Sequence, residues 1–451
     1  MENISIILVA HNQKDLIINQ INLLNTLNNI SSDSIIIVDN YSSDGLDSFL
    51  KAQNKFNYII CDEHIENFSS ILNLCISEFI LDTDILVIQP ECILMPSTID
   101  TLRNALDINK KIYAVTPLTL CNGYNNINSL SDAIAYSFSH THDNNSLSKI
   151  MKPLDNTVLI SKKLLNTSEP FDNNLISSEA VYSDFFMQNI LNDNFTYMVN
   201  NAYQYLITPY NDYYSDNYYN NVDDENIKNK WNTTYLNITP NYNLVDYIIE
   251  ADHLKSLNIL EVGCNTGSTL LEIKNIYPNS NLFGIEINAS TAKIASHIAN
   301  VKTADIEDSI DLWDGILFDY IIFGDVLEHL HNPSKIINNC RKILKNHGKI
   351  ISSIPNLMHY SAMYLLINGD FPYSDTGILD RTHIHFFTYN EIIKLYNENN
   401  FKVIKYKPIF SGIKLDDKLN AFIDNLVSIS THKNRQLYEA YQYVTLAEKL
   451  D

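Results

Sequence analysis

A short glycine-containing stretch near the middle of the chain has the residue types of a cofactor-binding turn. The run Leu260–Gly267 follows an apolar segment and precedes a stretch with helical periodicity. Small residues there let the backbone approach a ligand closely, and the start of a helix offers free N–H groups. Because the chain has only 11 glycines, Gly263 and Gly267 indicate positions where the backbone needs unusual freedom.

Carboxylates follow the glycine turn at positions where they could hold a nucleoside. Glu286 ends the next predicted strand, where a carboxylate can accept hydrogen bonds from both ribose hydroxyls. Asp305 and Ile306 come after the third predicted strand, at a place where an acceptor can read an adenine amino group. The spacing therefore predicts a nucleoside-type cofactor at the carboxyl edge of a parallel sheet.

These ordered motifs resemble the class I S-adenosylmethionine-dependent methyltransferases, especially those acting on small hydroxylated molecules and sugars. The resemblance implies a Rossmann-like seven-stranded domain over residues 242–412, with S-adenosyl-L-methionine as cofactor. The cofactor-binding residues that it implies are Glu261, Gly263, Asn265, Gly267, Glu286, Ile287, Asp305, Ile306 and Asp325. Asn265 stands where the family usually has glycine, but asparagine tolerates left-handed backbone angles, so we expect the loop to persist. The loop lacks the full G-x-G-x-x-G spacing, which argues against NAD.

Two histidines are candidates for the chemistry of methyl transfer. Displacement at a sulfonium depends mostly on positioning, and a base helps an oxygen acceptor to lose its proton. His329 follows the fourth predicted strand, and His383 lies in a stretch that resembles the D-x-T-H-x-x-x-F-T motif of the same group. We expect both to act as base or to orient the acceptor. A purely structural hydrogen bond is the alternative for each.

The first 208 residues have a second alternation of predicted strands and helices, which is typical of an α/β fold with a mostly parallel sheet. Asn12 follows the strand predicted at 4–9, and Asp39 follows the strand at 35–38 within the turn V-D-N-Y-S-S-D-G. This pattern resembles glycosyltransferase family 2. It implies a nucleotide-sugar-binding, GT-A-like domain over 1–208, in which Asp39 binds the base of the donor.

The same resemblance implies a divalent cation, Mn or Mg, that neutralises the departing diphosphate. It assigns donor binding to Asn12, Asp39 and Glu91, metal binding to Glu91, and the catalytic base to Asp184. Gln89 replaces a usual acidic residue, and the usual acidic pair is reduced to Asp184. Two interpretations stay open: an active transferase, which we favour, or a domain that retains the fold but only recognises a glycan or protein acceptor.

Composition excludes several classes of partner and location. A net charge of −22 argues against a surface that grips nucleic acid or anionic lipid. The six cysteines are scattered, as in a reduced cytosolic protein. No run reaches the ~18 apolar residues of a membrane span, and the first ten residues lack a basic lead-in. We therefore expect a cytoplasmic location.

Two further segments complete the predicted organisation. Residues 209–241 are rich in Tyr, Asn and Asp, which predicts a linker. Residues 413–451 have helical periodicity, which predicts a helical tail.

The sequence supports three hypotheses about function. In the first, a bifunctional enzyme transfers a sugar from a nucleotide-sugar donor and methylates the glycan. Such fusions resemble proteins of bacterial flagellin or surface-glycan biosynthesis, so the acceptor would be a glycan or a glycosylated protein such as flagellin. In the second, the N-terminal domain is a non-catalytic acceptor-binding module beside an active methyltransferase. In the third, the chain is a non-enzymatic scaffold, which would leave Glu286 and the glycine turn without a function. The sugar, the methylated atom and the oligomeric state stay open.

Overall fold

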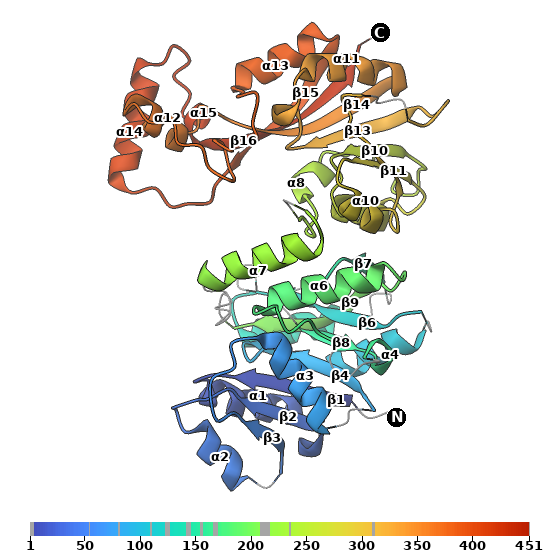
Figure 1. Ribbon diagram of the computed structural model, residues 1–451, viewed down its shortest axis with the longest axis vertical. Coiled ribbons are helices and arrows are strands. Elements are labelled where there is room, and N and C mark those ends of the chain that lie inside the picture. Colours follow the sequence, from blue (N-terminus) through green and yellow to red (C-terminus); the bar gives the residue numbers. More distant parts are fainter. Residues whose placement is uncertain are drawn as a thin grey trace. The chain divides into compact units, whose positions relative to one another are not determined.

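The structure is a computed structural model, and its contacts divide the chain into two compact units, Met1–Ile238 and Thr239–Asp451. Each unit has a sheet of its own (Figure 1). The residues that the structure describes are 4–53, 55–79, 82–108, 111–121, 127–140, 146–153, 157–165, 170–207, 217–233, 236–308 and 312–450.

The N-terminal unit begins with parallel strands in the order β3-β2-β1-β4, which confirms the strand and helix alternation predicted there. The elements of this part are β1 (Ile4–Ala10), α1 (Lys14–Asn28), β2 (Ile35–Asp39), α2 (Leu46–Ala52), β3 (Asn57–Ile60), α3 (Phe68–Phe79) and β4 (Asp84–Ile88). All five residues of β2 are buried, as expected for an inner parallel strand covered on both faces. Asn12 and Asp39 therefore follow the carboxyl ends of adjacent strands.

The second half of this unit is mixed, so the expected mostly parallel sheet holds only for its first four strands. Strand β8 pairs antiparallel with both β4 and β6, and β6 pairs parallel with β9. The elements are β5 (Cys92–Leu94), α4 (Thr98–Ile108), β6 (Ala114–Leu120), α5 (Leu130–His140), β7 (Leu147–Ile150), β8 (Val158–Ile160), α6 (Ser178–Ile190) and β9 (Thr196–Leu206).

The prediction that residues 209–241 form a linker is wrong for most of the described residues in that range. Residues 209–216 lie outside the described residues, but Asn217–Lys230 form helix α7. Ile227 and the following Trp231 are buried, so two apolar anchors are enough to hold a helix of polar composition.

The C-terminal unit is a seven-stranded sheet in its described residues, as predicted, in the order β12-β11-β10-β13-β14-β16-β15. Its strands are β10 (Asn258–Val262), β11 (Asn281–Glu286), β12 (Asn300–Thr303), β13 (Phe318–Gly324), β14 (Leu344–Pro355), β15 (Phe401–Phe410) and β16 (Ala440–Lys449). Its helices are α8 (Tyr242–Val245), α9 (Ser268–Ile276), α10 (Ala289–Ala295), α11 (Pro333–Ile343), α12 (Tyr360–Ile367), α13 (Tyr389–Glu398), α14 (Asp417–Ile429) and α15 (Gln436–Glu439). Strands β10 to β14 run parallel, which brings the ends of β10, β11 and β13 to one edge.

The prediction of a helical tail is wrong beyond α14 and α15. Strand β16 enters the sheet between β14 and β15 and is antiparallel to both. Its inner residues, such as Val444 and Leu446, are fully buried and pack in the core cluster that contains Ile259. The last residues therefore complete the core of the C-terminal unit.

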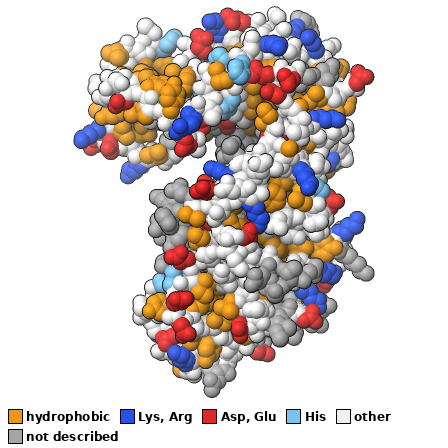
Figure 2. All heavy atoms as spheres, in the orientation of Figure 1, with side chains coloured by type: hydrophobic (Ala, Val, Ile, Leu, Met, Phe, Trp, Pro, Cys, Tyr) orange, Lys and Arg blue, Asp and Glu red, His pale blue; other side chains and the backbone are white. Residues whose placement is uncertain are grey.

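Helices α12 and α14 pack together and carry exposed apolar side chains, which are visible at the upper left of Figure 2. Tyr364, Ile367 and Ile429 are 51%, 60% and 81% exposed.

None of the helices in the described part of the chain combines the length and apolar character needed to cross a bilayer.

A buried hydroxyl chain ties β16 to the centre of the sheet. Tyr396 on α13 donates its hydroxyl to Ser352 on β14 at 2.7 Å, and Ser352 lies 2.8 Å from the hydroxyl of Thr445 on β16. All three residues are fully buried. The chain thus joins three elements that are distant in sequence.

We expect Tyr396→Phe to lower the free energy of unfolding of this unit by about 1 kcal/mol, because it removes one buried hydrogen bond without leaving a cavity. Hydrogen exchange of the β14 and β16 amides in the full chain measures the effect. The matched control is Tyr373→Phe, since Tyr373 is exposed. Equal exchange in the two variants would contradict the role given to this hydroxyl.

Candidate functional site

The glycine turn after β10 has the backbone conformation that its sequence predicts. Gly263 and Gly267 have φ of +69° and +83°. A Cβ on Gly263 would lie 2.6 Å from Cγ2 of Val326, so no other residue fits without movement. Asn265 adopts φ of +48°, which confirms that asparagine supplies the left-handed angle in place of glycine.

Glu286 joins this turn to the end of the neighbouring strand. One carboxylate oxygen accepts the backbone N–H of Asn265 and the other that of Asn288, both at 2.8 Å. A carboxylate has about four acceptor positions, so two remain for donors from a ligand. Glu286 thus both shapes the turn and keeps the capacity to accept two ribose hydroxyls.

Glu261 is a buried carboxylate below the same turn. Burial raises its pKa to about 8, against a smaller opposing effect of the Thr269 hydroxyl. Its Oε2 has no hydrogen-bond partner in the described part of the chain. A buried carboxylate oxygen without a partner is costly, and a cationic or hydrogen-bond-donating ligand would remove that cost. This feature fits a cofactor that carries an ammonium group.

The remaining predicted cofactor residues follow β11 and β12. Ile287 is 69% exposed directly after Glu286, so its side chain is open to a ligand. Asp305 is exposed and accepts the backbone N–H of Glu307 at 2.8 Å. Ile306 is buried in the core, so only its backbone can border an adenine.

The predicted acceptor side forms around the end of β13. Asp325 reaches solvent, yet the protein atoms around it remove enough water to raise its pKa. The rings of His329 and His383 are 4.7 Å apart in an edge-to-face arrangement. Burial, and then the neighbouring His383, hold the pKa of His329 below its usual range. The structure thus brings together two histidines that are distant in sequence.

The predicted donor-binding residues of the N-terminal unit lie on adjoining turns. Asn12 accepts the backbone N–H of Ser43 at 2.7 Å, which links the turns after β1 and β2. Asp39 is 1% exposed, and its Oδ2 has no hydrogen-bond partner among the described residues. Glu91 is also buried and accepts from the Gln13 side chain at 2.6 Å. These contacts place Asn12, Asp39 and Glu91 at one edge of the sheet.

Asp184, the predicted base, is engaged elsewhere. It is buried on α6, where Lys230 Nζ and Trp231 Nε1 donate to its two oxygens at 2.9 and 3.0 Å. Gln188 donates to it as well, at 2.7 Å. Because a cation and two N–H donors surround its carboxylate, Asp184 is arranged as a structural anchor for α7.

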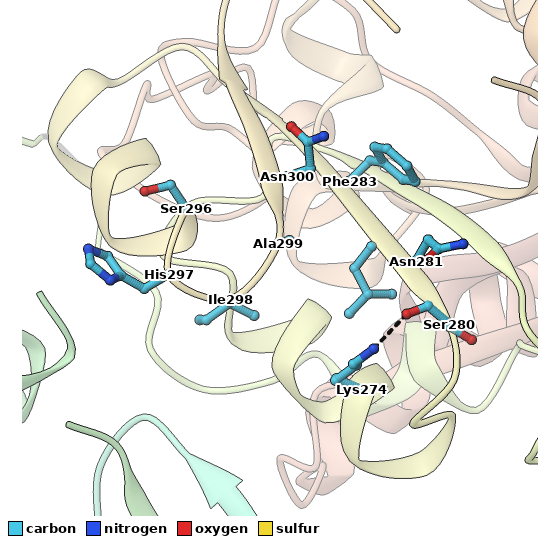
Figure 3. A pocket seen from close by; sticks show the side chains of 10 residues that line it. Lys274, Ser280, Asn281, Phe283, Ser296, His297, Ile298, Ala299 and Asn300 are labelled. Atoms are coloured by element: carbon cyan, nitrogen blue, oxygen red, sulfur yellow. Dashed lines mark hydrogen bonds between the residues drawn. The ribbon is translucent and has the colours of Figure 1, made fainter. Parts of the chain in front are cut away.

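In the C-terminal unit, a hollow of about 410 Å³ lies at the end of the sheet opposite to Glu286 (Figure 3). Lys274, Asn281 and Asn300 are among its lining residues, and the last two begin β11 and β12. Glu286 ends β11, so this hollow is separate from the predicted cofactor edge.

Sequence reasoning missed Glu328 and the pair formed by Lys230 and Trp231. Glu328 is 1% exposed, between the buried Leu327 and the half-buried His329. A lone charged residue within an apolar run was the available signal for it. The partners of Asp184 left no such signal, because they lie at the end of a helix whose composition resembles a linker.

Comparison with known proteins shows which family the C-terminal unit resembles. Residues 240–406 match the family described as a methyltransferase domain. The O-methyltransferase of ubiquinone biosynthesis from Coxiella burnetii is 27% identical over 135 residues, covering 28% of this chain and 56% of that protein. The chain thus spans about half the length of this relative. The enzyme of the same name from Rickettsia akari is 28% identical over 194 residues, covering 40% of this chain and 75% of the relative.

Among solved structures, an S-adenosylmethionine-dependent methyltransferase from Archaeoglobus fulgidus is 17% identical, with a TM-score of 0.33. The alignment covers 52% of this chain and all of that one. The matched residues, 240–406, contain the glycine turn, Glu286 and the predicted acceptor side. The C-terminal unit therefore matches the methyltransferase-domain family over residues 240–406.

Proposed function

We propose that the C-terminal unit binds S-adenosyl-L-methionine and transfers its methyl group to an oxygen of a hydroxylated acceptor. The observation that carries this proposal is the Glu286 carboxylate, which organises the glycine turn and retains acceptor positions toward the ligand side. The oxygen acceptor is supported by the name O-methyltransferase that the relatives carry.

The cofactor supplies an electrophilic methyl group on a sulfonium, and the residues of this chain bind and orient it. Glu286 would accept from the ribose, Glu261 from the ammonium group, and Asp305 with the backbone of Ile306 would border the adenine. The positive-φ turn keeps side chains out of the space that the ligand needs.

The acceptor would enter beside Asp325, His329 and His383. Because its pKa is lowered, His329 stays neutral over most of the physiological range and keeps a lone pair on its ring. The lone pair of His329 can therefore orient an acceptor hydroxyl.

For the N-terminal unit we propose a nucleotide-sugar-binding module rather than a working transferase. Oδ2 of Asp39 has no hydrogen-bond partner among the described residues, which supports binding of a nucleobase N–H. The contacts of Asp184 with Lys230 and Trp231 disfavour its use as a base. Under this proposal the methyl acceptor is a glycan or a glycosylated protein, such as a bacterial flagellin or surface glycan. A bifunctional enzyme with a cation at Glu91 is the second candidate, supported by the shared edge of Asn12, Asp39 and Glu91.

We expect Glu286→Gln to weaken binding of S-adenosylhomocysteine at least about tenfold, equivalent to about 1.4 kcal/mol, because an amide cannot accept on both sides. Calorimetry on the full chain measures this. Glu272→Gln, on the adjacent helix α9 and bonded to Asn275, is the control and should bind as the wild type does. Equal affinity in both variants would rule out the proposed role of Glu286.

We also expect cofactor affinity to rise with pH between about 6 and 8. In the free protein Glu261 is protonated below about pH 8, and a nearby ammonium group favours its charged form, so binding releases a proton in this range. Affinity measured by calorimetry should level off above pH 8. In Glu261→Gln the affinity should change with pH only through the titration of the ligand itself. A pH profile of affinity equal to that of the wild type would contradict the role assigned to Glu261.

A third prediction concerns the N-terminal unit. Asp39→Asn should weaken binding of uridine or guanosine diphosphate at least about tenfold, because the unpartnered oxygen becomes an amide group. Asp107→Asn, at an exposed position on α4, is the control.

Manganese-dependent hydrolysis of nucleotide sugars by the full chain then separates the two candidates. A binding module shows no hydrolysis in the wild type. Hydrolysis that Asp184→Asn abolishes would instead establish the bifunctional enzyme.

A further inference from the structure

Three side chains beside the predicted acceptor position bring one potential metal-ligand atom each close together. Ligand atoms of Glu328, His329 and His383 all lie within 4.8 Å of one another. Glu328 is 1% exposed, and neither of its carboxylate oxygens has a hydrogen-bond partner in the described residues. A buried carboxylate in this state is costly unless a proton or a cation accompanies it.

The backbone builds this cluster from two distant segments. The carbonyl oxygen of Glu328 accepts the N–H groups of Ile384 and His385 at 2.9 and 3.0 Å. This clip fixes the segment that contains His383 against the turn after β13. The three side chains are therefore held in place before any ligand binds.

The hydrogen bonds of the two rings leave the opposite nitrogens available. Nδ1 of His329 lies 3.2 Å from the carbonyl oxygen of Thr382, and Nδ1 of His383 lies 3.1 Å from that of Ile378. Nδ1 of His329 also lies 3.1 Å from the Thr382 hydroxyl, which donates to Asp380 at 2.6 Å and therefore accepts from the ring. Because these oxygens all accept, each Nδ1 carries the proton and each Nε2 keeps its lone pair. Histidines that bind metals show this same arrangement, with the second nitrogen donating to a carbonyl or carboxylate.

The charges around the cluster favour a cation. Asp325 and Asp380 lie close enough to Glu328 for their charges to act on its carboxyl group. Asp380 is fixed by the N–H and hydroxyl of Thr382 at 2.7 and 2.6 Å, so it stays close to the cluster. A divalent ion would be attracted by these carboxylates.

We propose that Glu328, His329 and His383 bind a divalent transition-metal ion. Two imidazole nitrogens and one carboxylate suit Zn²⁺ and its neighbours, with a coordination position left for an outside ligand, whereas Mg²⁺ prefers oxygen ligands. In the proposed methyl transfer the ion would orient an acceptor oxygen and lower its pKa. That role rests on the proposed function, but binding of the ion does not.

The test uses the full chain freed of metal by a chelator, without cofactor. Titration with Co²⁺, followed by its visible absorption, and with Zn²⁺ by calorimetry should show one ion per chain. Glu328→Gln and the double variant His329→Ala/His383→Ala should each weaken binding at least about tenfold. The control is His347→Ala, since His347 is an exposed residue that contacts Glu448 outside the cluster.

Absence of binding to the wild type would overturn the proposal, as would equal affinity in the wild type and in Glu328→Gln. Glu328→Gln preserves the shape of the side chain, so it decides the matter even where the double variant fails to fold. Calorimetry with S-adenosylhomocysteine on the same metal-free protein tests the proposed function separately. Loss of one binding event with retention of the other shows which of the two proposals fails.

Discussion

The geometry of the C-terminal unit depends on one carboxylate that bridges two neighbouring strand ends. Glu286 accepts backbone N–H groups from the turns after β10 and β11, so it fixes the glycine turn against the next strand. Because both strands are parallel and buried, their carboxyl ends cannot move independently. The edge that we propose for cofactor binding is therefore held in shape by the protein itself, which would lower the ordering cost of binding.

The features that local patterns encode were predictable from the sequence. The glycine turn and the left-handed Asn265 follow from residue types and spacing within a short window, whereas the seven-stranded sheet was implied by the family resemblance. Strand β16 was not predictable in this way, because its place between β14 and β15 depends on partners distant in sequence. Helix α7 was missed for a similar reason, since its stability comes from the burial of Ile227 and Trp231 rather than from helix-favouring composition.

Both units also show how a sequence motif can mislead about chemistry. Asp184 has the position of a base, but Lys230 and Trp231 occupy its oxygens, so its clearest role is to hold α7. Glu328 was inconspicuous in the sequence, yet burial beside two histidines gives it a stronger claim to function. In each case the partners of a carboxylate, rather than its motif, indicate what it does.

We propose that the edge formed by Glu261, Glu286 and Asp305 binds S-adenosylmethionine. A crystal structure of the full chain with S-adenosylhomocysteine tests it most directly. We expect the ribose hydroxyls at Glu286, the ammonium group at Glu261 and the adenine beside Asp305. A ligand bound in the hollow at the start of β11 and β12, or no ligand at a saturating concentration, would contradict it.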